Sequence, residues 1–378
     1  MTIDEVRDQF PYLKLGKIYL NHASLSPVPQ PVIDKANLFL KRRSETHIDD
    51  MSQYISDTEE AKQKLALLLN GEADRFAFFD NTSTGLNILA QGIDWKPGDR
   101  VLLNDVEFPS NVYPFLNLKH LGVEIDFVHS KKGAVNSNDI IAAVRPETRL
   151  IAISAVQFLS GYRANLKRIG EFCRERGIIF SVDAIQAVGA LPVDVSECKI
   201  DFLSSGTQKW LLGLMGLSFI YITEELQHEI TPRFVGWASM ENQTSLLDYN
   251  FTFKKSADAL QNGTINMIGV NALIGALDLL HAVGQARIQD RIVEHTLYLN
   301  ERLQEIGLKP LSAKYKLKNL SGIVSFASPR AKLISQKLTE AKISSSLREG
   351  FIRLSHHFYN TTEELEAAIE VIRTCKHK

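Results

Sequence analysis

The chain has 378 residues, of which 44% are hydrophobic and 23% charged, and its net charge is −1. A chain of this length is expected to form one large and one smaller domain. Because its charge is nearly balanced, it lacks the excess of basic residues that is typical of nucleic-acid-binding proteins, and we expect no nucleic-acid partner. Because the N-terminal residues are polar and the longest apolar run, 211–222, is too short to cross a bilayer, we expect no signal peptide and no membrane partner.

The first two thirds of the chain are predicted to alternate helices with short strands. Residues 1–19 hold a short helix and the start of a strand at 17–20, and helices follow at 31–43 and 57–69. Strands and helices then alternate at 76–79, 85–92, 101–104, 113–120, 123–128, 150–154, 166–176, 178–182 and 200–203. Short, continuous apolar strands are typical of a sheet covered on both faces, so we predict a mainly parallel, doubly wound α/β domain. Such domains bind ligands at the carboxyl ends of their strands.

The pattern changes near residue 271. Long helices at 271–283 and 286–306 precede strands at 322–326 and 351–354, and a capping box, Thr361-x-x-Glu364, opens a last helix. This order of helices and strands indicates a separate α+β domain. We therefore predict a large cofactor-binding domain over residues 20–270 and a small domain formed by residues 1–19 and 271–378.

Two strand ends carry the groups on which the functional prediction depends. Asp183 follows a buried strand, where a bare carboxylate is costly unless it meets a cation or strong donors. Lys209 follows the next strand and precedes an apolar run, a setting that depresses the pKa of an amine and favours Schiff-base chemistry. This pair suits pyridoxal phosphate, whose recurrent protein contacts are a lysine imine and an acid beside the pyridinium nitrogen. An ordinary surface ion pair is the alternative.

Residues 81–85 form a candidate phosphate site because they open a helix directly after the strand at 76–79. Free N–H groups at a helix N-terminus and the hydroxyls of Thr82 and Ser83 together suit an anion. The alternative is that these hydroxyls only cap the helix. Thr207 and Gln208, immediately before the lysine, could supply two further donors or form a polar turn.

The cofactor ring needs a flat neighbour and a donor to its phenolic oxygen. Phe108 follows the strand at 101–104 in a loop beside a proline, and it could stack on the ring or pack in the core. Gln186, three residues after Asp183, could reach the phenolic oxygen or be an exposed glutamine.

These residues, in this order, resemble the class V aminotransferase group of pyridoxal-phosphate enzymes of fold type I. The group includes cysteine desulfurases, kynureninases and isopenicillin-epimerase-like proteins. The resemblance runs from Tyr19 to Ser355, and Asp183-x-x-Gln186 with Lys209 is its most specific part. It implies a large α/β domain with a mainly parallel, seven-stranded sheet and a smaller α+β C-terminal domain.

The resemblance also implies a role for each residue that contacts the cofactor. Lys209 would carry the Schiff base, Asp183 would pair with the pyridinium nitrogen, and Gln186 would bind the phenolic oxygen. Phe108 would stack on the ring, as in the kynureninase-type variant. The phosphate would be held by Thr82, Ser83, Thr207 and Gln208.

Further residues are assigned to the substrate and to a partner chain. Thr264 matches a loop that reaches the phosphate of the other subunit, which implies a homodimer with shared sites. Arg353 would bind the substrate α-carboxylate, a task for a bidentate fork, or would otherwise be a surface arginine. His22 and Trp237 are candidates for walls of the substrate pocket, or packing residues.

The chain departs from the family pattern at two places. Desulfurases carry a reactive cysteine before the carboxylate-binding arginine, but residues 344–350 here contain none, and hydroxyls do not replace a thiolate. Residues 156–159 stand where many relatives have an asparagine that touches the phenolic oxygen, so Gln157 could replace it. The three cysteines are widely spaced and unpaired, which favours a reducing cytoplasm over disulfides or zinc, and Cys198 is expected to pack in the interior.

The sequence therefore predicts a pyridoxal-phosphate-dependent aminotransferase that acts on a small α-amino acid, with Lys209 as the base that moves the Cα proton. A lyase or epimerase of the kynureninase or isopenicillin-epimerase type is the alternative, and cysteine desulfurase is disfavoured. A nicotinamide dehydrogenase needs G-x-G-x-x-G and a serine hydrolase needs G-x-S-x-G, and the sequence contains neither motif. A protein that binds the cofactor without catalysis is a further alternative.

Overall fold

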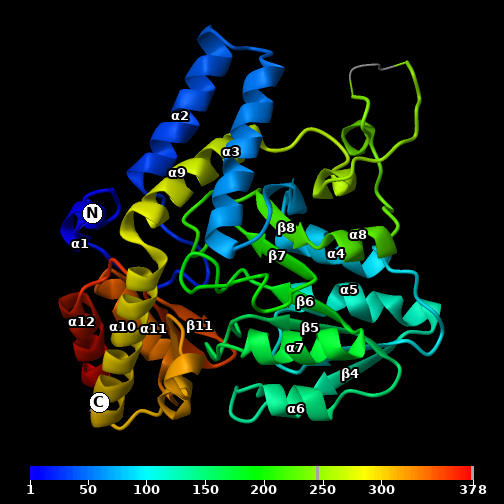
Figure 1. The fold of residues 1–378 in the computed structure, drawn as a ribbon. Helices are drawn as coiled ribbons and strands as arrows, with labels where there is room; N and C mark the ends of the chain where they lie inside the picture. The colour runs from blue at the N-terminus through cyan, green and yellow to red at the C-terminus, as the bar shows by residue number, and fades with distance from the viewer. Residues whose placement is uncertain (244–246, 376–378) are drawn as a thin grey trace.

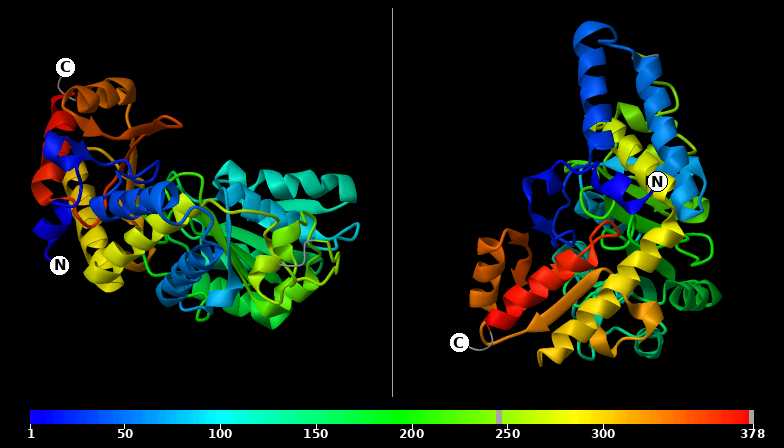
Figure 2. Two further views of the ribbon diagram at one scale, coloured as in Figure 1. Left: turned by 90° about the horizontal axis from the view of Figure 1, so that it is seen from above. Right: turned by 90° about the vertical axis from the view of Figure 1, so that its left-hand side faces the viewer.

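The computed structural model describes residues 1–243 and 247–375. A large sheet lies at one end of the molecule, and the C-terminal elements gather with the N-terminus at the other end (Figures 1 and 2). Among the described residues, no single helix meets the length and hydropathy expected of a membrane span. The helices α9 (Met267–Val283) and α10 (Gln285–Glu305) reach that length and hydropathy only when they are taken together, and this pair is bent by 78°.

Seven strands form the large sheet in the order β2–β8–β7–β6–β5–β3–β4. The neighbours from β7 to β4 pair in parallel, and β8 runs antiparallel to both β2 and β7. The predicted α/β fold with a mainly parallel sheet is thus confirmed. The strands are β2 (Phe76–Phe79), β3 (Arg100–Asn104), β4 (Glu124–Val128), β5 (Thr148–Ser154), β6 (Ile179–Asp183), β7 (Phe202–Gly206) and β8 (Ser218–Ile222).

Helices cover both faces of this sheet because its strands are apolar on both sides. On β3, Val101 and Leu103 belong to one buried cluster, whereas Leu102 belongs to another, as the alternation of a strand requires. The first cluster includes residues of α4 (Thr82–Gly92), α5 (Tyr113–Leu116) and α8 (Glu224–Glu229). The second includes residues of α2 (Gln30–Glu45), α3 (Met51–Leu69), α6 (Ser137–Ala142), α7 (Leu166–Arg176) and α9.

Several predicted boundaries differ from the structure, and two of these differences have a clear physical reason. The helix expected at 57–69 begins at Met51, because the Asp50 side chain accepts a hydrogen bond from the Gln53 amide and caps the helix six residues earlier. The strand expected at 200–203 runs instead from Phe202 to Gly206. Its last three residues are small and fully buried, so they fit between β6 and β8 although two of them are polar.

The C-terminal part has its own antiparallel sheet, β11–β12–β9, and its own apolar cluster. The predicted capping box is present: the Thr361 hydroxyl accepts from the Glu364 amide, and the Glu364 carboxylate accepts from the Thr361 amide. The remaining elements are α1 (Ile3–Arg7), β1 (Ile18–Tyr19), β9 (Ile323–Ala327), α11 (Ala331–Glu340), β10 (Ile343–Ser344), β11 (Ser346–Arg348), β12 (Phe351–Ser355) and α12 (Thr362–Thr374).

The domain division at residue 270 stays a prediction. Helix α1 is tied to the C-terminal part, since the Arg7 guanidinium donates to the Tyr359 carbonyl at 2.7 Å and pairs with Glu364 at 2.6 Å. Helix α9, however, contributes Val270 and Leu273 to the apolar cluster that it shares with the large sheet.

Candidate active site

A cavity of about 340 Å³ opens at the carboxyl ends of the central parallel strands. Phe108 follows β3, Asp183 ends β6, and Lys209 lies three residues beyond β7. Neighbouring parallel strands end at the same edge of the sheet, so residues far apart in the sequence meet there. Of the predicted site residues, the cavity is lined by Thr82, Ser83, Phe108, Asp183, Gln186, Gln208, Lys209 and Arg353.

A glycine brings the start of α4 next to the strand that precedes the lysine. An added Cβ at Gly85 would lie 2.5 Å from the Ser204 Oγ of β7, so a larger residue would push the helix away. Ser204 Oγ also donates to the Thr82 carbonyl at 3.1 Å. These contacts hold the N-terminus of α4 at the cavity.

The cap of α4 is Asn81, whose Oδ1 accepts from the Thr84 amide at 2.9 Å. The hydroxyls of Thr82 and Ser83 are therefore not needed as caps. Ser83 Oγ donates to Ser110 Oγ at 2.8 Å, whereas the buried Thr82 Oγ1 has no hydrogen-bond partner among the described residues. An unpartnered hydroxyl at a helix N-terminus that lines a cavity fits an anion such as a phosphate.

Lys209 lies in a setting that favours its neutral form. Burial lowers the pKa of its amine to about 8, with Arg353 and Arg348 acting in the same direction and the Asp183 carboxylate opposing them. Its Nζ lies 5.7 Å from the centre of the Phe108 ring and makes no hydrogen bond to any described residue. The amine is thus free to react with an aldehyde.

Asp183 is buried at the end of β6. Burial raises the pKa of its carboxyl to about 6, and the hydrogen bond from the Ile185 amide at 3.0 Å opposes that rise. The negative charge of Glu107 raises this pKa further, and the Lys209 ammonium lowers it. A cationic ring nitrogen beside this carboxylate would compensate its buried charge.

The orientation of the Gln186 amide follows from its neighbour Trp210. The indole Nε1 can only donate, and it lies 2.8 Å from Gln186 Oε1, so the oxygen must face the indole. Gln186 Nε2 donates to the Ala23 carbonyl at 2.9 Å, and its second N–H has no partner among the described residues. That N–H is available for an acceptor in the cavity.

Arg353 projects from β12 toward the cavity and is held by three neutral oxygens. Its Nη1 donates to the Phe158 carbonyl at 2.7 Å, and its Nη2 donates to Ser24 Oγ at 2.7 Å. Its Nε donates to Ser346 Oγ at 3.2 Å. Burial and the nearby Arg348 lower the pKa of the guanidinium to about 10, so it stays charged at neutral pH and has no carboxylate partner among the described residues.

Thr207 and His22 are not among the described residues that line this cavity, and both lie behind it. Thr207 is buried, and its hydroxyl donates to the Leu214 carbonyl at 2.7 Å. His22 is fully buried, with Nδ1 2.8 Å from the Ser355 carbonyl and Nε2 2.6 Å from the Tyr359 hydroxyl.

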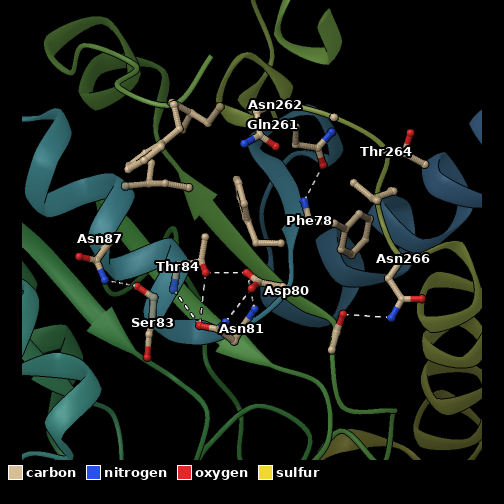
Figure 3. Close-up of a pocket in the computed structure, with 17 residues that line it drawn as sticks. Phe78, Asp80, Asn81, Ser83, Thr84, Asn87, Gln261, Asn262, Thr264 and Asn266 are labelled. Carbon is tan, nitrogen blue, oxygen red and sulfur yellow. Dashed lines mark hydrogen bonds between the residues drawn. The ribbon is translucent and has the colours of Figure 1, made fainter. Parts of the chain in front are cut away.

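Thr264 lies in a second cavity of about 910 Å³. Figure 3 shows Thr264 and Asn262 on one side of this space and Asn81, at the start of α4, on the other. Asn81 and Ser83 line both cavities, so the two spaces are neighbours. Trp237 is half exposed on a short 3-10 helix and lies outside both linings.

Glu107, to which no sequence motif assigns a role, has its carboxylate buried beside the site. Its Oε1 accepts from the Ser154 amide at 2.8 Å and from Gln157 Nε2 at 2.8 Å. Gln157, the expected substitute for the asparagine, is thus directed at Glu107, and its Oε1 is buried without a partner among the described residues. The one available signal was an acidic residue directly before Phe108.

A model of the class V aminotransferase family matches residues 18–368, so the chain belongs to this family. Its cofactor is pyridoxal phosphate, which the free amine of Lys209, the buried Asp183 carboxylate and the unpartnered Thr82 hydroxyl fit.

The chain is similar over nearly its whole length to proteins with different names. It is 28% identical to an uncharacterized aminotransferase, YcbU of Bacillus subtilis, covering 98% of this chain and 97% of that protein. It is also 28% identical to a probable cysteine desulfurase of Methanothermobacter thermautotrophicus, covering 98% of each chain. The isopenicillin N epimerase of Amycolatopsis lactamdurans is 26% identical over 94% of each chain.

The fold is shared with solved structures. The apo structure of a cysteine desulfurase from Thermococcus onnurineus NA1 superimposes with a TM-score of 0.90 at 25% identity, covering 99% of this chain and 98% of that chain. The fold is therefore that of fold type I, as the sequence resemblance implied.

Proposed function

We propose that this protein is a pyridoxal-phosphate-dependent aminotransferase that acts on a small α-amino acid. The observation that carries the proposal is the meeting of Lys209, Asp183 and Arg353 around one cavity at the carboxyl ends of parallel strands. Lys209 Nζ would hold the cofactor through its aldehyde, and the Asp183 carboxylate would hold its ring nitrogen. Thr82, at the N-terminus of α4, binds its phosphate, with Gln208 as a further donor. When bound, the cofactor withdraws electrons from the substrate Cα.

Arg353 binds the α-carboxylate of the substrate. Each of its three nitrogens donates one hydrogen bond to a neutral oxygen, so one N–H remains on each terminal nitrogen. These two N–H groups form a fork that matches the two oxygens of a carboxylate. The three bonds fix the plane of this fork and so orient Cα toward Lys209.

The amine of Lys209, freed when the substrate amine takes its place, would move the proton at Cα. A pKa of about 8 places its amine near neutral pH, where it can take a proton and return it efficiently. The carbon that receives this proton decides the outcome. Return of the proton to Cα by Lys209 would give racemisation, whereas amino-group transfer would require Lys209 to release the proton away from Cα.

The positions of the cysteines disfavour the desulfurase reaction that some relatives are named for. The three cysteines of the chain are all described, and none of them lines the cavity. Burial raises the pKa of the Cys198 thiol to about 11, and it raises that of Cys173 as well. Because a persulfide requires a thiolate at the substrate, the remaining alternatives are a lyase and an epimerase.

We also infer that the protein acts as a homodimer in which Thr264 reaches the phosphate of the other chain. This inference is supported by the second cavity, whose lining includes both Thr264 and the start of α4. The roles of His22, Trp237 and Thr207 and a cytoplasmic location stay predictions.

Replacing Lys209 tests the proposal. We expect borohydride reduction of the purified enzyme to label Lys209 on peptide mapping, and Lys209→Ala to remove the label. The turnover of the Lys209→Ala variant should fall by at least about 10²- to 10⁴-fold, because the covalent link to the cofactor and the base are both lost. Lys332→Ala, an exposed lysine on α11, is the matched control and should behave as the parent enzyme. A label on another lysine would overturn the assignment.

A panel of amino donors and keto acids then identifies the reaction. Keto-acid formation that needs an acceptor supports amino-group transfer. Pyruvate or sulfide released without an acceptor indicates a lyase, and loss of optical activity alone indicates an epimerase. Either result would contradict the aminotransferase assignment.

A further inference from the structure

The cavity of Lys209 contains more positive charge than the proposed function uses. Among the described residues that line it, the cationic ones are Lys209, Arg348 and Arg353, and Asp183 is the one carboxylate. Lys209 and Asp183 hold the cofactor, and Arg353 holds the α-carboxylate. Arg348 has no task in this scheme.

The register of the β11–β12 hairpin places both arginines on one face of the small sheet. Ser346 pairs with Arg353, and Leu347 pairs with Ile352. Side chains alternate along a strand, so Arg348 shares the face of Ser346, and Arg353 lies on that face too, as its hydrogen bond to Ser346 Oγ shows. Ile352 belongs to the apolar cluster on the opposite face, and the partly buried Leu347 packs against this cluster.

Arg348 is held beside Arg353 by the turn that joins the two strands. Arg348 pairs with Phe351 across this turn, and Glu349 and Gly350 between them have φ values of 47° and 80°. Two successive residues with positive φ are typical of the tight turns that match the twist of a hairpin. Arg348 and Arg353 therefore occupy diagonal positions of adjacent strands, within reach of each other for long side chains.

Neither guanidinium is neutralised within the described part of the chain. Arg353 donates only to neutral oxygens, and Arg348 forms no ion pair there. The charge of Arg348 lowers the pKa of both Arg353 and Lys209, which shows that the three cations repel one another. Like charges at such positions are unfavourable unless an anion lies between them.

We propose that Arg348 binds a second anionic group on the substrate, so that the amino acid or the keto acid that exchanges its amino group is dicarboxylic or carries an equivalent distal anion. This inference rests on the proposed function, because it takes Arg353 as the site of the α-carboxylate. Arg348 is exposed at the hairpin, so the substrate side chain points toward the mouth of the cavity.

Calorimetric titration of the holoenzyme with succinate and with butyrate tests the second anion site directly. The two ligands have the same carbon chain and differ by one carboxylate. We expect succinate to bind at least about 10-fold more tightly, and Arg348→Gln to weaken succinate binding about 10- to 100-fold with little change for butyrate. Arg348→Lys, which keeps the charge but not the fork, should give an intermediate affinity.

Arg168→Gln is the matched control, because it removes one positive charge from an exposed position on α7 outside the cavity lining. It should leave the affinity for succinate unchanged. If it weakened succinate binding as much as Arg348→Gln, a general effect of net charge would explain the result and the subsite would be refuted. Equal binding of the two ligands by the parent enzyme would refute it as well.

The spectrum of the bound cofactor separates failure of this inference from failure of the proposed function. If neutral and acidic amino acids shift the cofactor spectrum equally well and Arg348→Gln changes neither shift, the proposed function is supported and the second anion site is refuted. If no amino acid shifts the cofactor spectrum but Arg348→Gln still weakens succinate binding, the second anion site is supported and the proposed function is refuted. Circular dichroism of each variant checks that the fold is kept.

Discussion

Glu107 carries a buried carboxylate that connects several segments at the edge of the site. Its carboxylate accepts hydrogen bonds from Asn104 Nδ2, from Asn111 Nδ2 at 3.1 Å, from the amide and hydroxyl of Ser154, and from Gln157 Nε2. These donors are all neutral, and they satisfy both oxygens of a group that would otherwise be costly to bury. The arrangement fixes the loop that presents Phe108 to the cavity.

Replacing this acceptor by an amide should destabilise the protein strongly. Glu107→Gln places an NH₂ group among donors, so hydrogen bonds to a charged acceptor are lost and at least one buried donor is left unpaired. We expect the free energy of unfolding to fall by about 2 kcal/mol or more, measured by urea denaturation. Glu147→Gln, at an exposed position, is the control and should change it by less than about 0.5 kcal/mol. Equal stability of the two variants would contradict this account.

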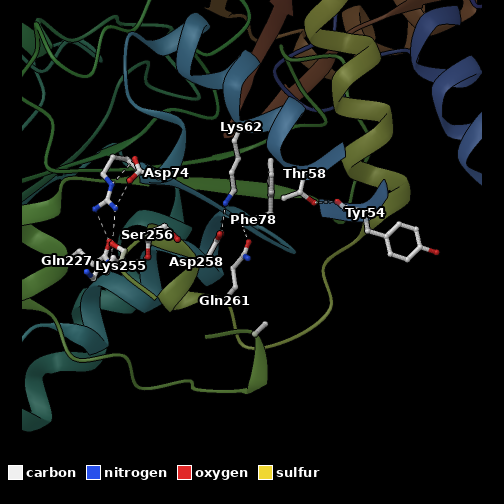
Figure 4. A network of polar contacts seen from close by, with 12 residues as sticks. Tyr54, Thr58, Lys62, Asp74, Phe78, Gln227, Lys255, Ser256, Asp258 and Gln261 are labelled. Atoms are coloured by element: carbon white, nitrogen blue, oxygen red, sulfur yellow. Dashed lines mark hydrogen bonds and ion pairs between the residues drawn. The ribbon is translucent and has the colours of Figure 1, made fainter. Parts of the chain in front are cut away.

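At the scale of elements, a buried ion pair connects α3 to the segment that leads to Thr264. Lys62 Nζ lies 2.6 Å from Asp258 Oδ1, and the Lys62 side chain is only 4% exposed. Figure 4 shows this pair beside the hydrogen bond from the Phe78 amide to Gln261 Oε1. Together they attach the segment around residues 258–261 to α3 and β2.

A second lysine of α3 provides a matched comparison for this pair. Lys64 lies 2.5 Å from Asp278, but the two side chains are 31% and 43% exposed. We expect Lys62→Met to lower the free energy of unfolding by about 2–4 kcal/mol, because Asp258 is left with an unpaired, largely buried charge. Lys64→Met should cost less than about 1 kcal/mol, because water solvates the remaining carboxylate. Thermal unfolding of both variants measures the difference, and similar losses would contradict the explanation.

At the scale of the whole molecule, buried histidines make the fold sensitive to acid. Burial lowers the pKa of His295 to about 3, that of His356 to about 4 and that of His357 to about 3, and it lowers that of His22 as well. The unfolded chain binds these protons near pH 6.5, whereas the folded chain binds them only below about pH 4. Stability is therefore complete above about pH 6.5 and falls as the pH decreases toward 4.

Calorimetry between pH 7.5 and 4.5 checks this expectation. Each buried histidine contributes a slope of up to about 1.4 kcal/mol per pH unit. Asp183 opposes them weakly in the cofactor-free protein, because the raised pKa of its carboxyl favours the folded state as the pH falls from about 6 to 4. His129→Gln, which alters an exposed histidine, should keep the same profile. A transition temperature that does not change over this range would contradict the prediction.

The placement of Asp183 and Lys209 at one cavity could be predicted from the sequence because it depends on local patterns. A short apolar strand predicts its own burial, and the residue after it lies at the edge where parallel strands end together. Asp183 and Lys209 both follow such strands, so their meeting in one cavity did not require knowledge of the packing. The capping box of α12 is equally local, since its partners are three residues apart.

The tertiary structure alone decided which side chains point into the cavity and which lie behind it. His22 and Thr207 are polar and close in sequence to site residues, yet packing directs both of them to partners outside the cavity lining. The donors around Glu107 come from separate segments, and Arg348 faces the cavity because of the register of a hairpin. Such contacts depend on how distant elements are brought together, and no periodicity along the chain records that information.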